Sequence, residues 1–184
     1  MKLDPSVRDS ILTAVPSLRA FAISLCGNVD RADDLVQETM LRALANIHSF
    51  QPGTNMSAWL FTILRNLFRS EYRKRKREVE DADGSYAESL KSQPDQLGRV
   101  EFQEFRTALG QLPDEQREAL ILVGASGFSY EEAADICGCA VGTVKSRVSR
   151  GRSQLAQLLG LQPGDSLGDG DAQHAPQGVI VGPW

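Results

Sequence analysis

SYEEAADICGCAVGTVKSRVSRGRSQLAQLL, residues 129–159, holds the local signals that decide the fold of this chain. Ser129 and Glu132 have the spacing of a capping box at a helix start. Gly138 then interrupts the helical pattern at a position suited to a left-handed turn. Beyond it, apolar residues return at steps of three and four, with a longer step at Gly151, and predict a second helix. The apolar stripe of that helix is Val141, Val144, Val148, Leu155 and Leu158.

The opposite side of this second helix is polar and basic. Its side chains are hydrogen-bond donors of the kind that phosphates and base edges accept. They are Thr143, Lys145, Ser146, Arg147, Ser149 and Arg150. A helix, a glycine turn and a helix with a basic outer face form a helix-turn-helix, which predicts DNA binding. An ordinary helical hairpin with a solvated face would show the same pattern.

Composition narrows the class of protein. The chain has 184 residues and 41% hydrophobic residues, enough for one domain or two small ones. No apolar run looks long enough to span a bilayer, and the N-terminus lacks the layout of a signal peptide. The odd cysteine count (Cys26, Cys137 and Cys139) favours a reducing, cytoplasmic location and no metal site. Neither His48 nor His174 sits in a catalytic setting. We therefore expect no cofactor and no enzymatic activity.

Charge is distributed unevenly although the net charge is only −4. Residues 65–77 carry seven basic side chains and one acid, whereas residues 78–98 carry six acids and one base. A basic block beside an acidic block suggests a nucleic-acid partner, and the two blocks could shield each other in a compact form.

Residues 5–47 predict two helices. The first covers residues 5–26, with Pro16 expected to kink or divide it and Gly27 to close it. The second is expected from Arg31 to about Ile47, capped by Asp30. Its predicted inner stripe is Leu35, Val36, Met40, Leu41 and Leu44.

A third helix is expected to open at Ser57, after a loop with proline and glycine, and to run into the basic block. Arg65, Arg69 and Arg73 share one face at four-residue steps. Aromatic residues interleave with them, an arrangement that suits single-stranded nucleic acid. The alternative is that the aromatics are core and the arginines only solubilise the helix. The aromatics are Trp59, Phe61, Phe68 and Tyr72.

The pattern predicts an all-α protein of two small helical domains joined by a flexible acidic linker. The expected divisions are a first domain at 1–77, a linker at 78–98, a second domain at 99–160 and a disordered tail at 161–184. In the second domain a helix ending near Gly110 and another beginning at Pro113 precede the helix-turn-helix, which makes four helices. The linker could span up to about 70 Å when extended, enough to reach two DNA elements.

Four motifs in this order resemble the extracytoplasmic-function (ECF) sigma factors of RNA polymerase over about residues 8–160. They are DDLVQETMLRAL (33–44), AWLFTILRNLFRSEYRKRK (58–76), LPDEQREALIL (112–122) and FSYEEAADICGCAVGTVKSRVSRGRSQL (128–155). The overall sequence is also similar to the alphaproteobacterial general-stress subfamily, the EcfG type, which a NepR-type anti-sigma factor restrains. Ala140 departs from the family, in which a Ser or Pro often opens the recognition helix.

The resemblance implies a protein that binds core RNA polymerase and promoter DNA in the cytoplasm and directs transcription of stress-response genes. It places Asp33, Asp34, Gln37 and Glu38 on the polymerase-binding helix. The loop over residues 51–57 would capture a flipped-out base of the −10 element. The residues implied for the −10 element are Asn55, Trp59, Arg65, Asn66, Arg69 and Arg73. Those implied for the −35 element are Tyr130, Thr143, Lys145, Ser146, Arg147 and Arg150.

Two other functions fit parts of the sequence. A helix-turn-helix transcription regulator would not contact core polymerase, but it would leave the first domain without a purpose. A sigma-like interaction protein would titrate an anti-sigma factor and would not need DNA-reading side chains. This chain retains such side chains at Asn66, Arg69, Lys145 and Arg147.

Overall fold

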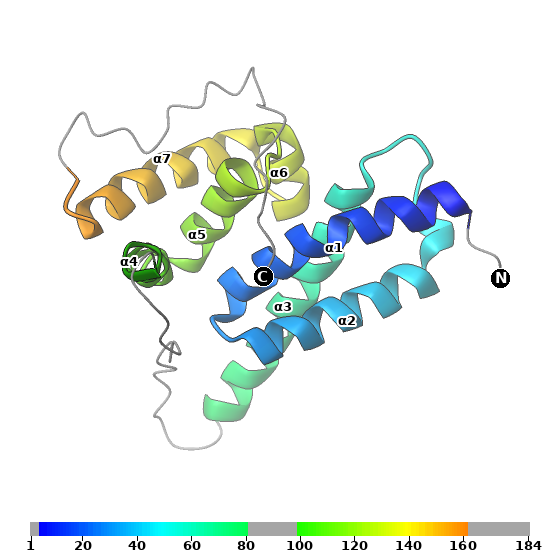
Figure 1. The fold of residues 1–184 in the computed structure, drawn as a ribbon, viewed down its shortest axis with the longest axis horizontal. Helices are drawn as coiled ribbons and strands as arrows, with labels where there is room; N and C mark the ends of the chain where they lie inside the picture. Colours follow the sequence, from blue (N-terminus) through cyan, green and yellow to red (C-terminus); the bar gives the residue numbers. More distant parts are fainter. Residues whose placement is uncertain (1–3, 81–98, 162–184) are drawn as a thin grey trace.

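A computed structural model describes residues 4–80 and 99–161, and every regular element in these two ranges is helical (Figure 1). This confirms the predicted all-α class. The predicted linker and tail lie almost entirely outside the described ranges, as do the linker acids Asp81 and Asp83. The first group of helices is α1 (Pro5–Cys26), α2 (Val29–Ala45), the short 3-10 turn η1 (Ile47–Ser49) and α3 (Met56–Glu80). The second group is α4 (Arg99–Gly110), α5 (Asp114–Leu120), the π-helical turn η2 (Ile121–Ala125), α6 (Tyr130–Cys137) and α7 (Val141–Leu158).

Helices α1, α2 and α3 pack around a shared apolar core. Leu18 and Leu64 are fully buried there, and the rings of Phe21 and Phe61 stack with centroids 5.0 Å apart. Helix α1 continues through Pro16 without being divided, and Gly27 closes it with a φ of 66°, the left-handed conformation expected for a glycine.

The start and the inner face of α2 differ from the prediction. The cap is Asn28, whose Oδ1 accepts from the Arg31 amide at 2.9 Å, so the prediction of Asp30 was wrong. The Asn28 carboxamide caps the free amides two residues earlier in the chain, and the helix therefore begins two residues sooner. Leu41 and Leu44 are 64% and 43% exposed rather than part of the inner stripe. The buried face of α2 consists of Ala32, Leu35, Val36, Thr39 and Ala43.

Helix α1 is the one helix in the described residues that is long and apolar enough to cross a membrane, which corrects the expectation that no segment was. Its 22 residues pass that test on length and composition. Its apolar side, however, packs into the core beside α2 and α3, where Leu18, Phe21 and Ala22 are fully buried. The hydropathy of α1 is therefore that of a core helix.

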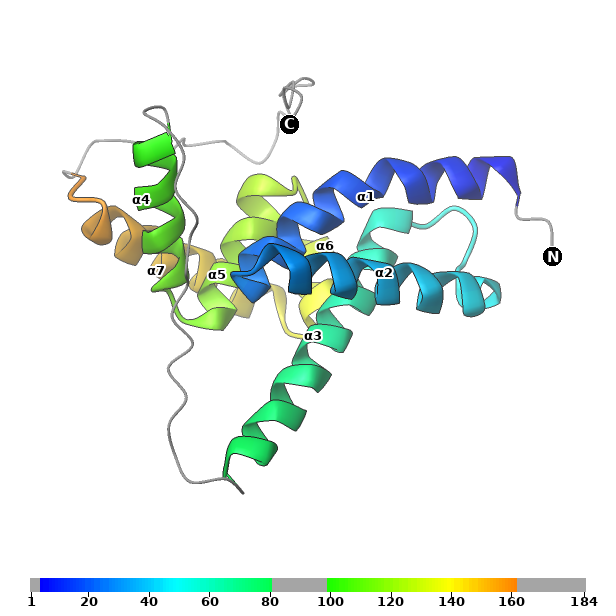
Figure 2. The ribbon, with the colours of Figure 1, turned by 60° about the horizontal axis from the view of Figure 1, so that its bottom comes forward.

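Helix α3 is a single helix, as predicted, and it carries the basic block away from the rest of the molecule (Figure 2). It begins at Met56 and extends to Glu80, three residues into the predicted linker. Phe61 and Phe68 are buried, so these interleaved aromatics belong to the core, whereas Tyr72 is 50% exposed. Trp59 packs against Phe50 with ring centroids 5.4 Å apart.

The second group of helices contains the predicted helix-turn-helix. Ser129 and Glu132 form both hydrogen bonds of the capping box, and Gly138 has a φ of 61° at the turn. Ala140 occupies the N-cap of α7 and makes no side-chain hydrogen bond there. Gly151 lets α7 approach α5 closely, because a Cβ at this position would lie 2.8 Å from Leu120 Cδ1. The helix expected to begin at Pro113 is α5, which a π-helical turn continues to Ala125.

The two helical domains pack against each other and share one continuous core. Helix α3 lies against α6, and the ring of Phe61 meets the edge of Phe128 with centroids 4.8 Å apart. The sequence left open whether the chain is compact or extended. In this structure it is compact, with α5 and α6 beside the upper half of α3 (Figures 1 and 2).

Candidate nucleic-acid and polymerase interfaces

The outer face of α7 presents most of the residues predicted to read the −35 element. Val144 and Val148 are buried beneath it, which turns Lys145, Ser146 and Arg150 toward solvent. The Ser146 hydroxyl donates to the Thr143 carbonyl at 2.9 Å, and Arg150 donates to Ser146 from its Nε and Nη2 at 3.2 Å each. These contacts hold the polar side chains along one face of the helix.

Tyr130, at the start of α6, lies beside this face. The Lys145 ammonium stands 5.6 Å from the centroid of the Tyr130 ring, a cation–π contact. The structure therefore brings Tyr130 and Lys145 together, although they lie on different helices.

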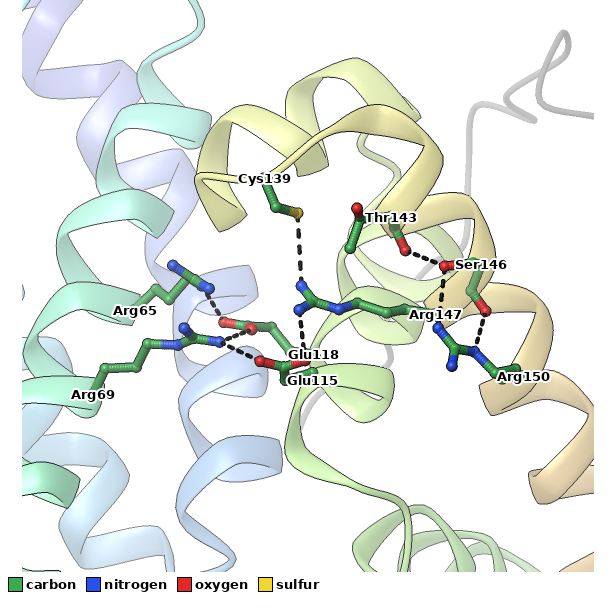
Figure 3. A network of polar contacts seen from close by, with 9 residues as sticks. All are labelled: Arg65, Arg69, Glu115, Glu118, Cys139, Thr143, Ser146, Arg147 and Arg150. Carbon is green, nitrogen blue, oxygen red and sulfur yellow. Dashed lines mark hydrogen bonds and ion pairs between the residues drawn. The ribbon is translucent and has the colours of Figure 1, made fainter.

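Arg147 differs from its neighbours on α7. Its side chain is 16% exposed and points toward α5, where Nη2 donates to Glu115 Oε2 at 2.5 Å (Figure 3). Its Nη1 donates to the Cys139 thiol sulfur at 3.6 Å. Burial raises the pKa of the neighbouring Cys137 thiol to about 12, so that thiol is protonated at neutral pH.

The residues predicted to act at the −10 element divide into two sets on α3. Asn66 and Arg73 are exposed. Arg65 and Arg69 instead turn toward α5, where both bind the carboxylate of Glu118 (Figure 3). The Arg65 and Glu118 side chains are only 6% and 4% exposed, so this ion pair is buried between the domains.

Asn55 stands just before α3, at the end of the loop predicted to hold a flipped base. Its Oδ1 accepts from the Ala58 amide at 3.3 Å, and its Nδ2 donates to Glu132 Oε1 at 2.7 Å. Glu132 belongs to α6, so this hydrogen bond also crosses between the domains. The loop borders a groove of about 600 Å³ that α1 closes on its other side.

The predicted polymerase-binding residues lie on the outer side of α2, and two of the four are engaged in ion pairs. Asp33 accepts from Arg19 at 2.6 and 3.1 Å, and this hydrogen-bonded guanidinium lowers the pKa of the Asp33 carboxyl. Glu38 accepts from Arg42 at 2.8 Å. Asp34 and Gln37 are exposed.

Sequence reasoning missed the apolar part of this surface. Leu41 and Leu44 lie at helical spacing from Asp34 and Gln37 and are exposed. Exposed leucines rimmed by polar side chains are typical of a protein-binding site. The helical periodicity of α2 is compatible with two adjacent apolar stripes, and it does not indicate which of them faces the core.

Comparison with known proteins identifies the class. Sigma-70 region 2 matches residues 11–78, and Sigma-70, region 4 matches residues 102–155. The ECF RNA polymerase sigma factor EcfG of Rhodopseudomonas palustris (strain TIE-1) is 72% identical over 175 residues, which cover 95% of this chain and 97% of that protein. The chain therefore belongs to the family of ECF RNA polymerase sigma factors, as the four motifs indicated.

Two solved structures share the fold. The sigma factor RpoE in complex with the anti-sigma factor NepR from Bartonella quintana matches with a TM-score of 0.80 and 54% identity, over 87% of this chain and 100% of that chain. The anti-anti-sigma factor PhyR, complexed with NepR from the same organism, matches with a TM-score of 0.53 and 18% identity, over 82% of this chain and 49% of that chain. The second likeness is one of fold alone.

Proposed function

We propose that this chain binds core RNA polymerase in the cytoplasm and directs it to stress-response promoters by reading two DNA elements. The observation that carries the proposal is the 72% identity to an EcfG sigma factor over nearly the whole chain. As a sigma factor the chain contributes binding and specificity, and the catalysis belongs to the polymerase.

The outer face of α7 is proposed to read the −35 element as duplex DNA. The first residues of a recognition helix contact base edges in the major groove, and later ones contact phosphates. Thr143 and Lys145 stand in the first turns of α7, with Ser146 and Arg147 beside them, and Arg150 follows one turn further on. Tyr130 supports Lys145 from α6.

The N-terminal half of α3 and the loop before it are proposed to act on the −10 element as it opens. Asn55, Trp59 and Asn66 would contact unpaired bases, and Arg65, Arg69 and Arg73 would hold the backbone. An extruded base costs a few kcal/mol of lost stacking and pairing, which contacts of this kind repay. The groove beside the loop offers a place for such a base.

The outer face of α2 is proposed to bind the polymerase. Asp34, Gln37 and Glu38 lie one to two turns before the exposed Leu41 and Leu44 along α2, which gives a surface with an acidic part and an apolar part. Asp33 completes the acidic side, although Arg19 already holds it. We further propose a NepR-type anti-sigma factor as a partner, because a 54% identical relative was crystallised with NepR.

In vitro transcription with purified core polymerase and promoter DNA tests the proposal. Promoter-specific transcripts that depend on this chain are the expected result. A sigma-like interaction protein, the second candidate, would bind a NepR-type protein and yet support no transcription. The fold it shares with PhyR suggests this candidate, but the identity to PhyR is only 18%.

A further inference from the structure

The interface between the two domains pairs residues proposed to bind DNA with glutamates of the second domain. Arg65 shows this most clearly. Its Nε donates to Glu118 Oε1 at 2.5 Å across 53 residues of sequence, and both side chains are almost completely buried. Arg65 has no access to DNA while this pair holds. Removing one partner would leave a buried charge uncompensated, so the pair favours the docked arrangement once it has formed.

The same carboxylates engage further arginines. Arg69 Nη2 lies 3.1 Å from Glu118 Oε2 and 4.0 Å from Glu115 Oε1, and Arg147 Nη2 lies 2.5 Å from Glu115 Oε2. Figure 3 shows the guanidinium groups of α3 and α7 converging on α5 from opposite sides. A carboxylate offers a guanidinium the same paired oxygens as a phosphate does. Glu115 and Glu118 therefore present to these arginines the kind of acceptor that a DNA phosphate would present.

A third carboxylate reaches the −10 loop. Glu132 accepts from Asn55 at 2.7 Å, so the side chain proposed to meet an unpaired base is already bound. The contact of Phe61 with Phe128 lies in the shared core of the two domains. Apolar contact thus holds the domains together. The glutamates determine which first-domain side chains, Asn55, Arg65 and Arg69, are bound at the interface.

Other surfaces stay open in this arrangement. Asn66, Lys145 and Arg150 remain exposed, and so do Asp34 and Leu41 on the proposed polymerase-binding face. Polymerase can therefore reach α2 while the domains are docked. Promoter DNA, in contrast, cannot engage Asn55, Arg65, Arg69 and Arg147 together.

We propose that the docked domains form an autoinhibited state in which Glu115, Glu118 and Glu132 mimic promoter DNA, so that polymerase binds before DNA is read. The inference rests on the proposed function, because it takes the arginines as DNA contacts. Undocking breaks the contacts of Arg65 and Arg69 with Glu118, whereas the pair of Arg147 and Glu115 lies within the second domain and must be broken separately. Separation of the domains then exposes Asn55, Arg65 and Arg69 for the −10 element, and promoter phosphates replace Glu115 at Arg147.

The free, full-length chain tests this with Glu115→Gln combined with Glu118→Gln. The control removes two exposed carboxylates of the same domain, Glu104→Gln with Asp135→Asn. Affinity for promoter duplex is measured by fluorescence anisotropy across a salt series. The Glu115/Glu118 variant should bind about tenfold more tightly than the control at low salt, with a salt slope steeper by about 2, because Arg69 and Arg147 become free for phosphates. Equal affinity and slope in the two variants would overturn the proposal.

Exchanging the charges of the Arg65–Glu118 pair tests the docking of the domains independently of DNA affinity. Glu118→Arg should expand the free chain in small-angle X-ray scattering, because three arginines would then face one another. Adding Arg65→Glu should restore the compact dimensions. An unchanged radius of gyration in the single variant would overturn the proposal, and circular dichroism confirms that the helices remain.

Measurements of core-polymerase binding and of transcription distinguish failure of this proposal from failure of the proposed function. Wild-type chain should bind core polymerase as tightly as the Glu115/Glu118 variant, because α2 is open in both. A much tighter complex with the variant would overturn the order of binding. If the wild-type chain supports no transcription with core polymerase, the proposed function fails, whereas the scattering result on the docked domains stands by itself.

Discussion

At the scale of single residues, neighbouring side chains on one helix have different partners. Lys145 and Arg150 are exposed on α7, whereas Arg147, between them in sequence, turns toward Glu115 on α5 of its own domain. The two exposed residues, Lys145 and Arg150, also differ in their position along the helix. Lys145 stands near the N-terminal end, where recognition helices meet base edges, and Arg150 stands farther along, where they meet phosphates.

Lys145→Ala and Arg150→Ala are expected to affect promoter recognition differently. Loss of a base contact at Lys145 should cost about 1–3 kcal/mol and relax the sequence requirement at one upstream position. Loss of a phosphate contact at Arg150 should weaken all promoters alike and reduce the salt slope by about 1. Holoenzyme binding to a set of single-base promoter variants, measured at several salt concentrations, distinguishes them. The same loss of specificity in both variants would contradict this assignment.

Glu132 makes the stability of the folded chain depend on pH. Its carboxylate accepts from the Ser129 amide, which lowers its pKa below the ordinary 4.5; partial burial opposes this shift and the Asn55 side chain adds to it. A lowered folded-state pKa contributes stability that is present above about pH 4.5 and lost as the pH falls through the folded value. Thermal unfolding followed from neutral to acidic pH should show a shallower acid loss in Glu132→Gln. Glu131→Gln, an exposed neighbour, serves as the control and should behave like wild type.

At the scale of elements, each helix of the first domain uses one face for the core and another for a partner. The core face of α2 is lined by small and β-branched side chains as well as Leu35. Its outer face combines acids with two exposed leucines. The core face of α3 is aromatic and aliphatic, and its basic half extends beyond the bundle (Figure 2).

Combining Asp34→Lys with Leu41→Ser on α2 should reduce binding to core polymerase by about tenfold or more, since central interface side chains commonly contribute over 1 kcal/mol each. Stability should change by less than about 1 kcal/mol, because both side chains are exposed. Pull-down with core polymerase and a melting curve give the two measurements. Leu12→Ser, an equally exposed leucine on α1, is the matched control. Normal binding by the α2 variant would remove this face from the polymerase interface.

Asn66→Ala on α3 should impair promoter opening while leaving the upstream element bound. A hydrogen bond to a base edge is worth about 1–3 kcal/mol, so open complexes should fall about tenfold or more. Permanganate reactivity of the melted strand reports opening, and footprinting reports the upstream contact. If the upstream footprint disappears as well, α3 and α7 do not act on separate elements.

At the scale of the whole molecule, the two domains behave as one folded body in this arrangement. They share a continuous core, and the buried pair of Arg65 and Glu118 joins them. Elements that share a core unfold together, so the free chain should lose both domains in a single transition.

Chemical denaturation tests this cooperativity with two probes. Trp59 fluorescence, measured with Trp184→Phe in every variant, reports the first domain, and far-ultraviolet circular dichroism reports all helices. Their transitions should coincide in the wild-type chain and separate in Glu118→Lys, which places a lysine against Arg65. Transitions that are already separate in the wild type would show that the interface contributes little to stability.

Local rules in the sequence determined the helices, their ends and the class of protein. The capping box at Ser129 and the left-handed turn at Gly138 depend on residues within a few positions of each other, so the sequence alone predicts them. The four family motifs are also local, and the comparisons confirmed the class that they indicated. Where two local signals competed, as at Asn28 and Asp30 or between the stripes of α2, the prediction was wrong.

The state of the proposed DNA-binding residues was decided only by tertiary structure. Nothing near Arg65 in sequence distinguishes it from Arg73, yet Arg65 is buried and Arg73 is exposed. The difference comes from Glu118, 53 residues away on another domain. A charged side chain is buried only when an opposite charge meets it, and that meeting depends on how the domains pack. Helical periodicity gives the face of a residue on its own helix, whereas the partner across a domain interface follows from the packing of the whole chain.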